Sequence, residues 1–493
     1  MARTTPARRA ALRILGDCRR RGARARDLMR GSDVLAALLP RDRSFATRLV
    51  LGVTRCSGGL DSIVEAHLSR GSKLEPRLRD ALRIAAFELL FLSTPAQVGV
   101  SQGVELAREV APRAAGLANA VLRRVAQDEP PRLASARSRL RMLASTATEE
   151  VPDHLGPAGP LVADLSLAGC LPAWLVRELA RSLGPARAAA LALGSLEPST
   201  PSVAANLLGL DEGPSRQLLE EAGLVPEALP WPGAFRLVHP AALASSGLVQ
   251  SARVIPSDLA AQVIAWLSCP NGGRLLEVGQ GRGTKTLLMQ SAAHALGIDL
   301  QMASVESDPH KSASSARRLV SVGVGGRASC HVLDGRELAG PDESLPGDLR
   351  GEFRLALLDA PCSGSGTLRR HPEVAWSLAE GQALRELPRL QLELLGAASR
   401  RVARGGTLVY STCSELRQED EGVVEAFLAS EAGRCFSLAD PLDAPVTGSL
   451  LPGQLSLARS MLTPEGYLRS SGANGPGSQL CDGHFMARLR REG

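Results

Sequence analysis

The chain has 493 residues, of which 44% are hydrophobic and 3% aromatic, and it carries a formal net charge of +6 at pH 7. This length is too great for one domain, so two or three domains with aliphatic cores are expected. The sequence has no apolar run of about 18 residues, and its N-terminus lacks the apolar segment of a secretory signal. We therefore expect neither a membrane-spanning nor an exported protein.

The nine cysteines lie far apart and form no C-x-x-C motif: Cys18, Cys56, Cys170, Cys269, Cys330, Cys362, Cys413, Cys435 and Cys481. Without an export signal, this pattern indicates reduced thiols in the cytoplasm rather than a disulfide framework. It also lacks the paired spacing of a zinc site, so no metal is expected.

Arginine supplies nearly all of the positive charge, because only Lys73, Lys285 and Lys311 are lysines among the 57 basic residues. A codon bias toward arginine accounts for the general excess. Ten arginines fall within residues 1–30, beside two acidic residues. That dense basic start favours a partner that carries phosphate groups.

The first part of the chain has a helical pattern. Residues 5 to about 126 place apolar residues at spacings of three and four, as in "RLRDALRIAAFELLFL" (77–92), and predict an all-helical domain over 1–130. From residue 128 the sequence "DEPPRLASARSRLRMLASTATEEVPDHLGPAGP" is rich in proline, serine and alanine. We interpret 131–168 as a linker with at most one short helix.

The remaining sequence predicts a small segment and a larger α/β domain. Helix-like pieces followed by short apolar stretches predict an α+β segment over 169–253. Between 254 and 493 strands alternate with helices, which predicts a mostly parallel sheet covered on both faces. The strands are expected at 273–279, 301–307, 328–335, 354–360 and 405–412.

Unusual residues recur where these predicted strands end: Gly279, Glu306, Asp334, Asp359 and Cys413. Ligands of parallel sheets bind beyond the carboxyl ends of the strands. Residues of a core would instead be scattered along the strands. The shared position therefore predicts one binding site at this edge of the sheet.

A glycine loop, "LLEVGQGRGTKT" (275–286), lies between a predicted strand and a predicted helix. Glycines let the backbone approach a ligand closely, and the helix N-terminus adds a favourable dipole. The spacing differs from those of dinucleotide-binding and phosphate-binding loops. The candidate binding residues are Gly279, Gln280, Gly281, Arg282, Gly283, Thr284 and Lys285.

Two acidic residues follow the next strands. Glu306 is placed to accept hydrogen bonds from ribose hydroxyls, and Asp334 is placed to meet an adenine edge. Together with the glycine loop they describe an adenosyl ligand without a polyphosphate, which fits S-adenosylmethionine. The alternative is that each acid caps the N-terminus of a helix.

Two cysteine motifs follow apolar strands, "DAPCSGSGTLRRHPE" (359–373) and "YSTCS" (410–414). A thiolate that adds to carbon 6 of a pyrimidine makes carbon 5 able to attack a methyl donor. A base must then remove the proton from carbon 5, and an acid near the ring nitrogen stabilises the adduct. Cys413, Cys362 and Asp359 fit these parts, whereas the other seven cysteines are interpreted as small core hydrophobes.

The two motifs, with Glu419 and Glu421 after the second, resemble those of RNA cytosine-C5 methyltransferases. In that family the thiol of the T-C-S motif is the nucleophile, and the thiol of the P-C-S motif releases the product. The resemblance implies these roles for Cys413 and Cys362. Asp359 is assigned both to the catalytic residues and to the cofactor-binding residues.

Two further blocks, "RDRSFATRLVLGVTRCSGGLDSIV" (41–64) and "AGLANAVLRRVA" (115–126), resemble the NusB-like RNA-binding domain of Sun-type (RsmB-type) 16S rRNA cytosine methyltransferases. The resemblance implies an all-α NusB-like domain, a small α+β RNA-recognition segment and a Rossmann-like class I methyltransferase domain. It also implies S-adenosylmethionine-dependent methylation of a 16S rRNA cytidine. RNA is the expected partner, without membrane, metal or DNA.

The cofactor loop departs from that family. Residues 279–286 read G-Q-G-R-G-T-K-T where the family has C-A-A-P-G-G-K-T. We expect cofactor binding to survive, because the glycine form is common among methyltransferases. Ala204 stands where the family has an arginine two residues before Asn206, which affects RNA contacts more than chemistry. Lys285 is expected either to extend at the helix start or to contact Asp359 or the target base.

Two other functions compete with rRNA methylation. The first is the same chemistry on tRNA, which would use the same residues. The second is a non-catalytic NusB-like RNA-binding or antitermination factor with an inert cofactor loop. The retention of Asp359, Cys362 and Cys413 together favours an enzyme. The target nucleotide, the form of rRNA that is bound and the oligomeric state stay open.

Overall fold

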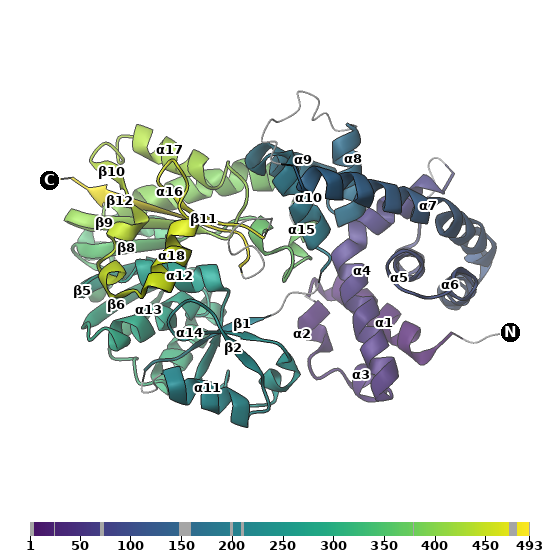
Figure 1. The fold of residues 1–493 in the computed structure, drawn as a ribbon, viewed down its shortest axis with the longest axis horizontal. Helices are drawn as coiled ribbons and strands as arrows, with labels where there is room; N and C mark the ends of the chain where they lie inside the picture. Colours follow the sequence, from purple (N-terminus) through teal and green to yellow (C-terminus); the bar gives the residue numbers. More distant parts are fainter. Residues whose placement is uncertain are drawn as a thin grey trace. The chain divides into compact units, whose positions relative to one another are not determined.

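The computed structural model describes residues 4–23, 25–69, 73–146, 159–197, 201–208, 212–377, 379–472 and 481–492 (Figure 1). The chain divides into two units, and each has its own hydrophobic core. The helical unit contains Met1–Glu197 and Leu368–Leu378, and the α/β unit contains Pro198–Thr367 and Ala379–Gly493.

The helical unit is built on long helices with apolar stripes: α1 (Pro6–Arg21), α4 (Pro40–Ala66), α5 (Pro76–Phe91), α6 (Ala96–Val110) and α7 (Ala115–Ala144). Shorter helices complete it: α2 (Ala25–Met29), α3 (Asp33–Ala36), α8 (Pro160–Gly169), α9 (Ala173–Leu183), α10 (Pro185–Gly194) and α15 (Val374–Ser377). Proline starts α1, α4 and α5, where its missing N–H is no loss. Leu49, Leu60, Leu82, Leu106 and Leu122 are fully buried, so the prediction of a helical N-terminal region is confirmed.

Helix α7 differs from the predicted linker. It continues through Pro130 and Pro131 as far as Ala144. A proline inside a helix removes a hydrogen bond and costs about 3 kcal/mol. Here Leu133 and Leu140 continue the buried stripe beyond the prolines, and this burial offsets the loss. The part of the predicted linker at 147–158 lies outside the described residues.

A short segment from the second half of the chain belongs to the helical unit. Leu368–Leu378 comes directly after the P-C-S motif and contains α15. The indole N–H of Trp376 donates to the carbonyl oxygen of Arg55, 3.3 Å away. The ring lies against Gly58 of α4, where an added Cβ would be 1.8 Å from a ring carbon. The glycine therefore makes the room that the indole fills.

No single helix among the described residues is both long and apolar enough to cross a membrane. One bent pair, α8 with α9, meets the length and composition together, with an angle of 110° between the helices. Leu165 of α8 and Leu179 of α9 are buried, so these helices use their apolar residues inside the helical unit.

The α/β unit begins with a small antiparallel sheet in the order β2-β3-β1-β4. Its strands are β1 (Ser202–Ala205), β2 (Pro226–Ala228), β3 (Ala234–Leu237) and β4 (Val254–Pro256), with helix α11 (Glu212–Glu221). Val203, Phe235 and Leu237 are fully buried in its core. The α+β segment predicted from the sequence is therefore present, whereas α9 and α10 belong to the helical unit.

The large sheet has the order β10-β12-β9-β8-β5-β6-β7, with β11 paired to β12. Its strands are β5 (Gly273–Val278), β6 (Leu300–Glu306), β7 (Ala328–Val332), β8 (Phe353–Asp359), β9 (Val402–Thr412), β10 (Phe436–Ala439), β11 (Leu468–Ser470) and β12 (His484–Arg491). Strands β7, β6, β5, β8 and β9 are parallel neighbours, and β12 is antiparallel to β9. The predicted mostly parallel α/β fold is confirmed.

Helices cover both faces of this sheet (Figure 1). Helices α12 (Leu259–Leu267), α13 (Thr284–Ala295) and α14 (Pro309–Ser321) share a core with Leu275 of β5. Helices α16 (Leu387–Ser399) and α17 (Glu421–Ala429) share the other core with Leu276. The alternation of neighbouring side chains along β5 thus places one residue in each core.

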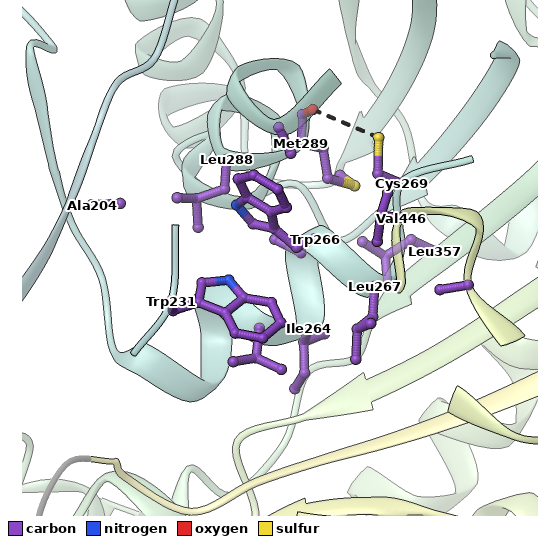
Figure 2. Close-up of a cluster of buried hydrophobic side chains, with 14 of the residues drawn as sticks. Ala204, Trp231, Ile264, Trp266, Leu267, Cys269, Leu288, Met289, Leu357 and Val446 are labelled. Atoms are coloured by element: carbon purple, nitrogen blue, oxygen red, sulfur yellow. Dashed lines mark hydrogen bonds between the residues drawn. The ribbon is translucent and has the colours of Figure 1, made fainter. Parts of the chain in front are cut away.

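Figure 2 shows the first of these cores around Trp231 and Trp266, whose rings meet edge to face at 6.3 Å. The thiol of Cys269 lies 4.0 Å from the carbonyl oxygen of Met289 in α13. Burial raises the pKa of Cys269 to about 12, as suits a core thiol. This packing holds α13, and with it the C-terminal end of the glycine loop, against the sheet.

Candidate active site

The residues singled out at strand ends lie at one edge of the large sheet. Gly279 follows β5, Glu306 ends β6, Asp334 lies just beyond β7, Asp359 ends β8 and Cys413 follows β9. These strands are parallel neighbours, so their carboxyl ends meet at the same edge. The sheet thus gathers groups that are up to 134 positions apart in the numbering, from 279 to 413.

The glycine loop passes close to strand β8. Gly279, Gly281 and Gly283 have φ angles of 83°, 60° and 74°, which favour glycine. A Cβ at Gly279 would lie 2.2 Å from the carbonyl oxygen of Asp359, and one at Gly283 would lie 2.3 Å from Oγ of Ser315. At Gly281 nothing lies within 4 Å of the Cβ position. The loop therefore leaves open space at Gly281, where a ligand can approach the backbone.

The other loop residues have different surroundings. Arg282 is exposed, and Thr284 begins α13. The amide nitrogen of Gln280 lies 3.3 Å from Oγ1 of Thr286 and 3.2 Å from Sγ of Cys330. The Oε1 atom of Gln280 is buried without a hydrogen-bond partner in the described part of the chain. A ligand that donates to this oxygen would satisfy it.

Glu306 orders the glycine loop directly. Its Oε2 atom accepts a hydrogen bond from the amide of Gly281 at 2.8 Å, and its Oε1 atom accepts one from the amide of Asp308 at 2.9 Å. Asp308, rather than Glu306, caps helix α14. The N-cap alternative is therefore wrong for Glu306, and its contact with a ribose stays a prediction.

Asp334 behaves as the N-cap alternative describes. Its side chain accepts from the amide of Arg336 at 3.0 Å and pairs with the Arg336 guanidinium at 2.6 Å. The hydrogen bond from Arg336 lowers the pKa of Asp334. Both carboxylate oxygens thus have local partners, and a contact with adenine stays a prediction.

A buried acid that sequence reasoning missed lies beneath the loop. Glu277 of β5 is fully buried and accepts hydrogen bonds from Oγ1 of Thr286 at 2.6 Å and Oγ of Ser304 at 2.9 Å. Burial raises its pKa to about 7, although both hydroxyls favour the ionised form. Its place two residues before Gly279, inside the quoted glycine-loop sequence, was the available signal.

The two motif cysteines are in direct contact. The sulfur atoms of Cys362 and Cys413 are 3.4 Å apart, and the amide of Cys413 donates to Sγ of Cys362 at 3.4 Å. The hydrogen bond from Cys362 lowers the pKa of Cys413, and the same contact with burial raises the pKa of Cys362. The contact therefore favours ionisation of Cys413 over ionisation of Cys362.

Lys285 and Asp359 form an ion pair beside these thiols. The Nζ atom of Lys285 lies 2.7 Å from Oδ2 of Asp359, and Ser411 donates to Oδ1 at 3.3 Å. Burial opposes the charge of Lys285, but Asp359 and Cys413 outweigh it and raise the pKa of the ammonium group. The expected contact of Lys285 with Asp359 is confirmed. The side chains of Lys285 and Asp359 thus lie beside the two motif cysteines.

Two family models match separate segments of the chain. The model described as 16S rRNA methyltransferase RsmB/F matches residues 264–445, and the NusB family model matches residues 5–127. The first match includes the glycine loop and both cysteine motifs, and the second covers the sequence that folds into α1 to α6.

Individual proteins match over most of the chain. Ribosomal RNA small subunit methyltransferase B of Thermus thermophilus is 31% identical over 410 residues, which cover 83% of this chain and 84% of that protein. The protein of the same name from Citrobacter koseri is 27% identical over 456 residues, 91% of each chain. The crystal structure of PH0851 aligns over 100% of both chains with a TM-score of 0.71 and 20% identity, which supports the fold alone.

Proposed function

This chain belongs to the RsmB/F family of RNA cytosine-5 methyltransferases, with a NusB-family N-terminal region, and from that premise we propose that it methylates a cytidine of 16S rRNA. The observation that carries the proposal is the cluster of Cys413, Cys362, Lys285 and Asp359 at the sheet edge. The two relatives named as small-subunit rRNA methyltransferases support rRNA as the substrate class.

The glycine loop has the features that suit S-adenosylmethionine, which when bound supplies a methyl group activated by a sulfonium charge. Gly281 borders open space, and the start of α13 presents backbone N–H donors. The unpartnered Oε1 of Gln280 offers an acceptor from within the described loop. In this proposal residues 279–285 hold the cofactor, and Glu306 and Asp334 contact its ribose and adenine.

Cys413 is the nucleophile in this proposal. Its thiolate adds to carbon 6 of the cytosine, and the electron pair displaced toward carbon 5 makes that carbon nucleophilic. Asp359 accepts hydrogen bonds from the exocyclic amino group of cytosine, a contact that suits a carboxylate. Lys285 pairs with Asp359 at 2.7 Å and favours the thiolate form of Cys413.

Cys362 assists release of the product. Once Cys413 is bonded to carbon 6, its negative charge is gone, and the interaction that raises the pKa of Cys362 is removed. Cys362 can then lose its own proton to solvent and, as a thiolate, take the proton from carbon 5. The electron pair of that C–H bond restores the ring double bond and expels Cys413 as a thiolate.

In this proposal the helical unit binds the RNA. Its basic N-terminal segment contacts phosphates, so binding should weaken steeply as salt is raised. The target cytidine must be unstacked, because carbon 6 is not accessible within a helix. The described residues form no disulfide bond, which is consistent with a cytoplasmic enzyme.

Transfer of labelled methyl from S-adenosylmethionine to naked small-subunit rRNA and, in parallel, to bulk tRNA tests this function. Label in rRNA alone that is lost in Cys413→Ala is the expected result. Label in tRNA would contradict rRNA as the substrate and would still support the proposed chemistry. A folded, RNA-binding protein that labels neither RNA would favour the non-catalytic binding factor.

A further inference from the structure

Each of the two motif cysteines is followed by a serine, and both serines bind the same carboxylate. The hydroxyls of Ser363 and Ser414 donate to Oε2 of Glu419 at 2.5 Å and 2.6 Å. The amide of Ser363 donates to Oε1 of Glu419 at 2.8 Å. One side chain thus connects the two loops that carry Cys362 and Cys413.

Glu419 is itself held in place. Tyr410 of β9 donates its hydroxyl to the carbonyl oxygen of Glu419 at 2.5 Å. The side-chain amide of Gln391 in α16 donates to Oε1 of Glu419 at 3.2 Å and to the carbonyl oxygen of Pro361 at 2.8 Å. The carboxylate is therefore tied to the sheet, to a covering helix and to the residue before Cys362.

This connection is shielded from water. Glu419, Ser414 and Gln391 are 0% exposed, and Ser363 is 4% exposed. Burial raises the pKa of Glu419, while the hydroxyl and amide donors favour its charged form. A carboxylate that accepts several hydrogen bonds in a dry environment resists displacement, since water cannot replace the lost donors.

We propose that Glu419 is a positioning residue that sets the separation and orientation of the two reactive sulfur atoms. It acts through Ser363 and Ser414, the neighbours of the cysteines, and has no role in the bond changes. With both neighbours fixed, the sulfur positions depend mainly on the cysteine side-chain rotamers. This inference deepens the proposed function and rests on it for the roles of Cys413 and Cys362.

Loss of the hydrogen bonds to Glu419 should mainly affect the step that needs both thiols at once. Addition to carbon 6 needs Cys413 alone, whereas release needs Cys362 close to carbon 5 of the same adduct. Loss of the connection should therefore slow release more than addition. A misplacement of about 1 Å is enough to lower a rate on the order of 100-fold.

Disulfide formation between the two cysteines measures their geometry without methyl transfer. The ligand-free full-length protein is treated with diamide, and the Cys362–Cys413 peptide pair is quantified by mass spectrometry. The variants are Glu419→Ala, Glu419→Gln and the control Glu425→Gln, which alters an acid that is 54% exposed and paired with Arg417. We expect about tenfold slower cross-linking in Glu419→Ala, partial recovery in Glu419→Gln and no change in the control.

Turnover gives the second readout. In Glu419→Ala we expect a lower kcat with nearly unchanged KM, and more protein held as an RNA adduct on a denaturing gel. Wild-type rates of cross-linking and release in a folded Glu419→Ala would overturn the inference. If that variant does not fold, Glu419→Gln with unchanged cross-linking and kcat overturns it.

The two proposals fail in different ways. If cross-linking depends on Glu419 but the protein methylates no RNA, the positioning role stands and the proposed function is wrong. If the wild type methylates rRNA but the Glu419 variants match Glu425→Gln in cross-linking and in turnover, the proposed function stands and the positioning role is wrong.

Discussion

The Nζ atom of Lys285 lies 2.7 Å from Oδ2 of Asp359, although the two residues belong to different motifs. Lys285 comes from the first turn of α13, and Asp359 is the last residue of β8. Strands β5 and β8 are parallel neighbours, so the loop that follows β5 reaches the end of β8. The ion pair therefore connects the glycine loop with the P-C-S motif.

Removal of this cation should lower the reactivity of Cys413, the proposed nucleophile. The hydrogen bond from Cys362 and the charge of Lys285 both lower the pKa of Cys413, so Lys285→Met should raise that pKa. Alkylation of Cys413 by iodoacetamide should then need a higher pH, and methyl transfer should fall by about 100-fold. Lys311→Met, at an exposed lysine, is the matched control. An unchanged alkylation profile would contradict the electrostatic role.

Replacement of Gly279 should disturb the site and the fold together. Gly279→Ala combines a φ of 83° with a Cβ placed 2.2 Å from the carbonyl oxygen of Asp359. Gly297→Ala has a similar φ of 66° but nothing within 4 Å. In urea unfolding, Gly279→Ala should lose about 2 kcal/mol more than Gly297→Ala. Equal losses would mean that the close approach to β8 is unimportant.

Stability should depend on pH through Glu277. Its pKa is about 7 in the folded protein and about 4.5 in a free side chain, so the folded state holds the proton more tightly. This contribution to stability is full below pH 4.5, falls as the pH rises to about 7, and is then constant. Between pH 4 and pH 8, the free energy of unfolding of the wild type should fall by about 3 kcal/mol relative to that of Glu277→Gln. Glu425→Gln should show no such shift.

Loss of Cys362, which releases the product in the proposed mechanism, should trap the reaction. Cys362→Ala should form a covalent adduct with rRNA that survives a denaturing gel, because addition by Cys413 needs only one thiol. The double variant with Cys413→Ala should form none. An adduct in that double variant would place the nucleophile elsewhere.

The contact of Trp376 with α4 gives a prediction for the helical unit. Gly58→Ala would normally stabilise a helix by about 0.5–1 kcal/mol. Here the added Cβ would lie 1.8 Å from the Trp376 ring, so the change should instead destabilise by about 1–3 kcal/mol. Gly116→Ala in α7, with nothing within 4 Å, is the control. Thermal unfolding would compare the two, and a stabilised Gly58→Ala would contradict the packing of Trp376.

Local sequence patterns were enough for the fold class and for the edge of the sheet that carries the site. Alternating apolar strands and helices predicted β5, β6, β7, β8 and β9, because burial on both faces requires continuous apolar runs. Since parallel strands share one carboxyl edge, the residues after them could be grouped without knowledge of the strand order. The chemical prediction for the two cysteine motifs likewise came from the sequence and stays a prediction.

Other features depend on contacts between residues that are far apart in the sequence, and only the tertiary structure reveals them. Helix α7 continues through Pro130 because residues far along the chain bury its apolar stripe, and this outweighs the local preference of proline. The proposed role of Glu419 depends on the pairing of β8 with β9, which brings Ser363 beside Ser414. The distance of 3.4 Å between the sulfur atoms of Cys362 and Cys413 likewise follows from the order of the strands, which is set by packing across the whole sheet. Sequence determined which groups were available, and long-range packing determined which of them meet.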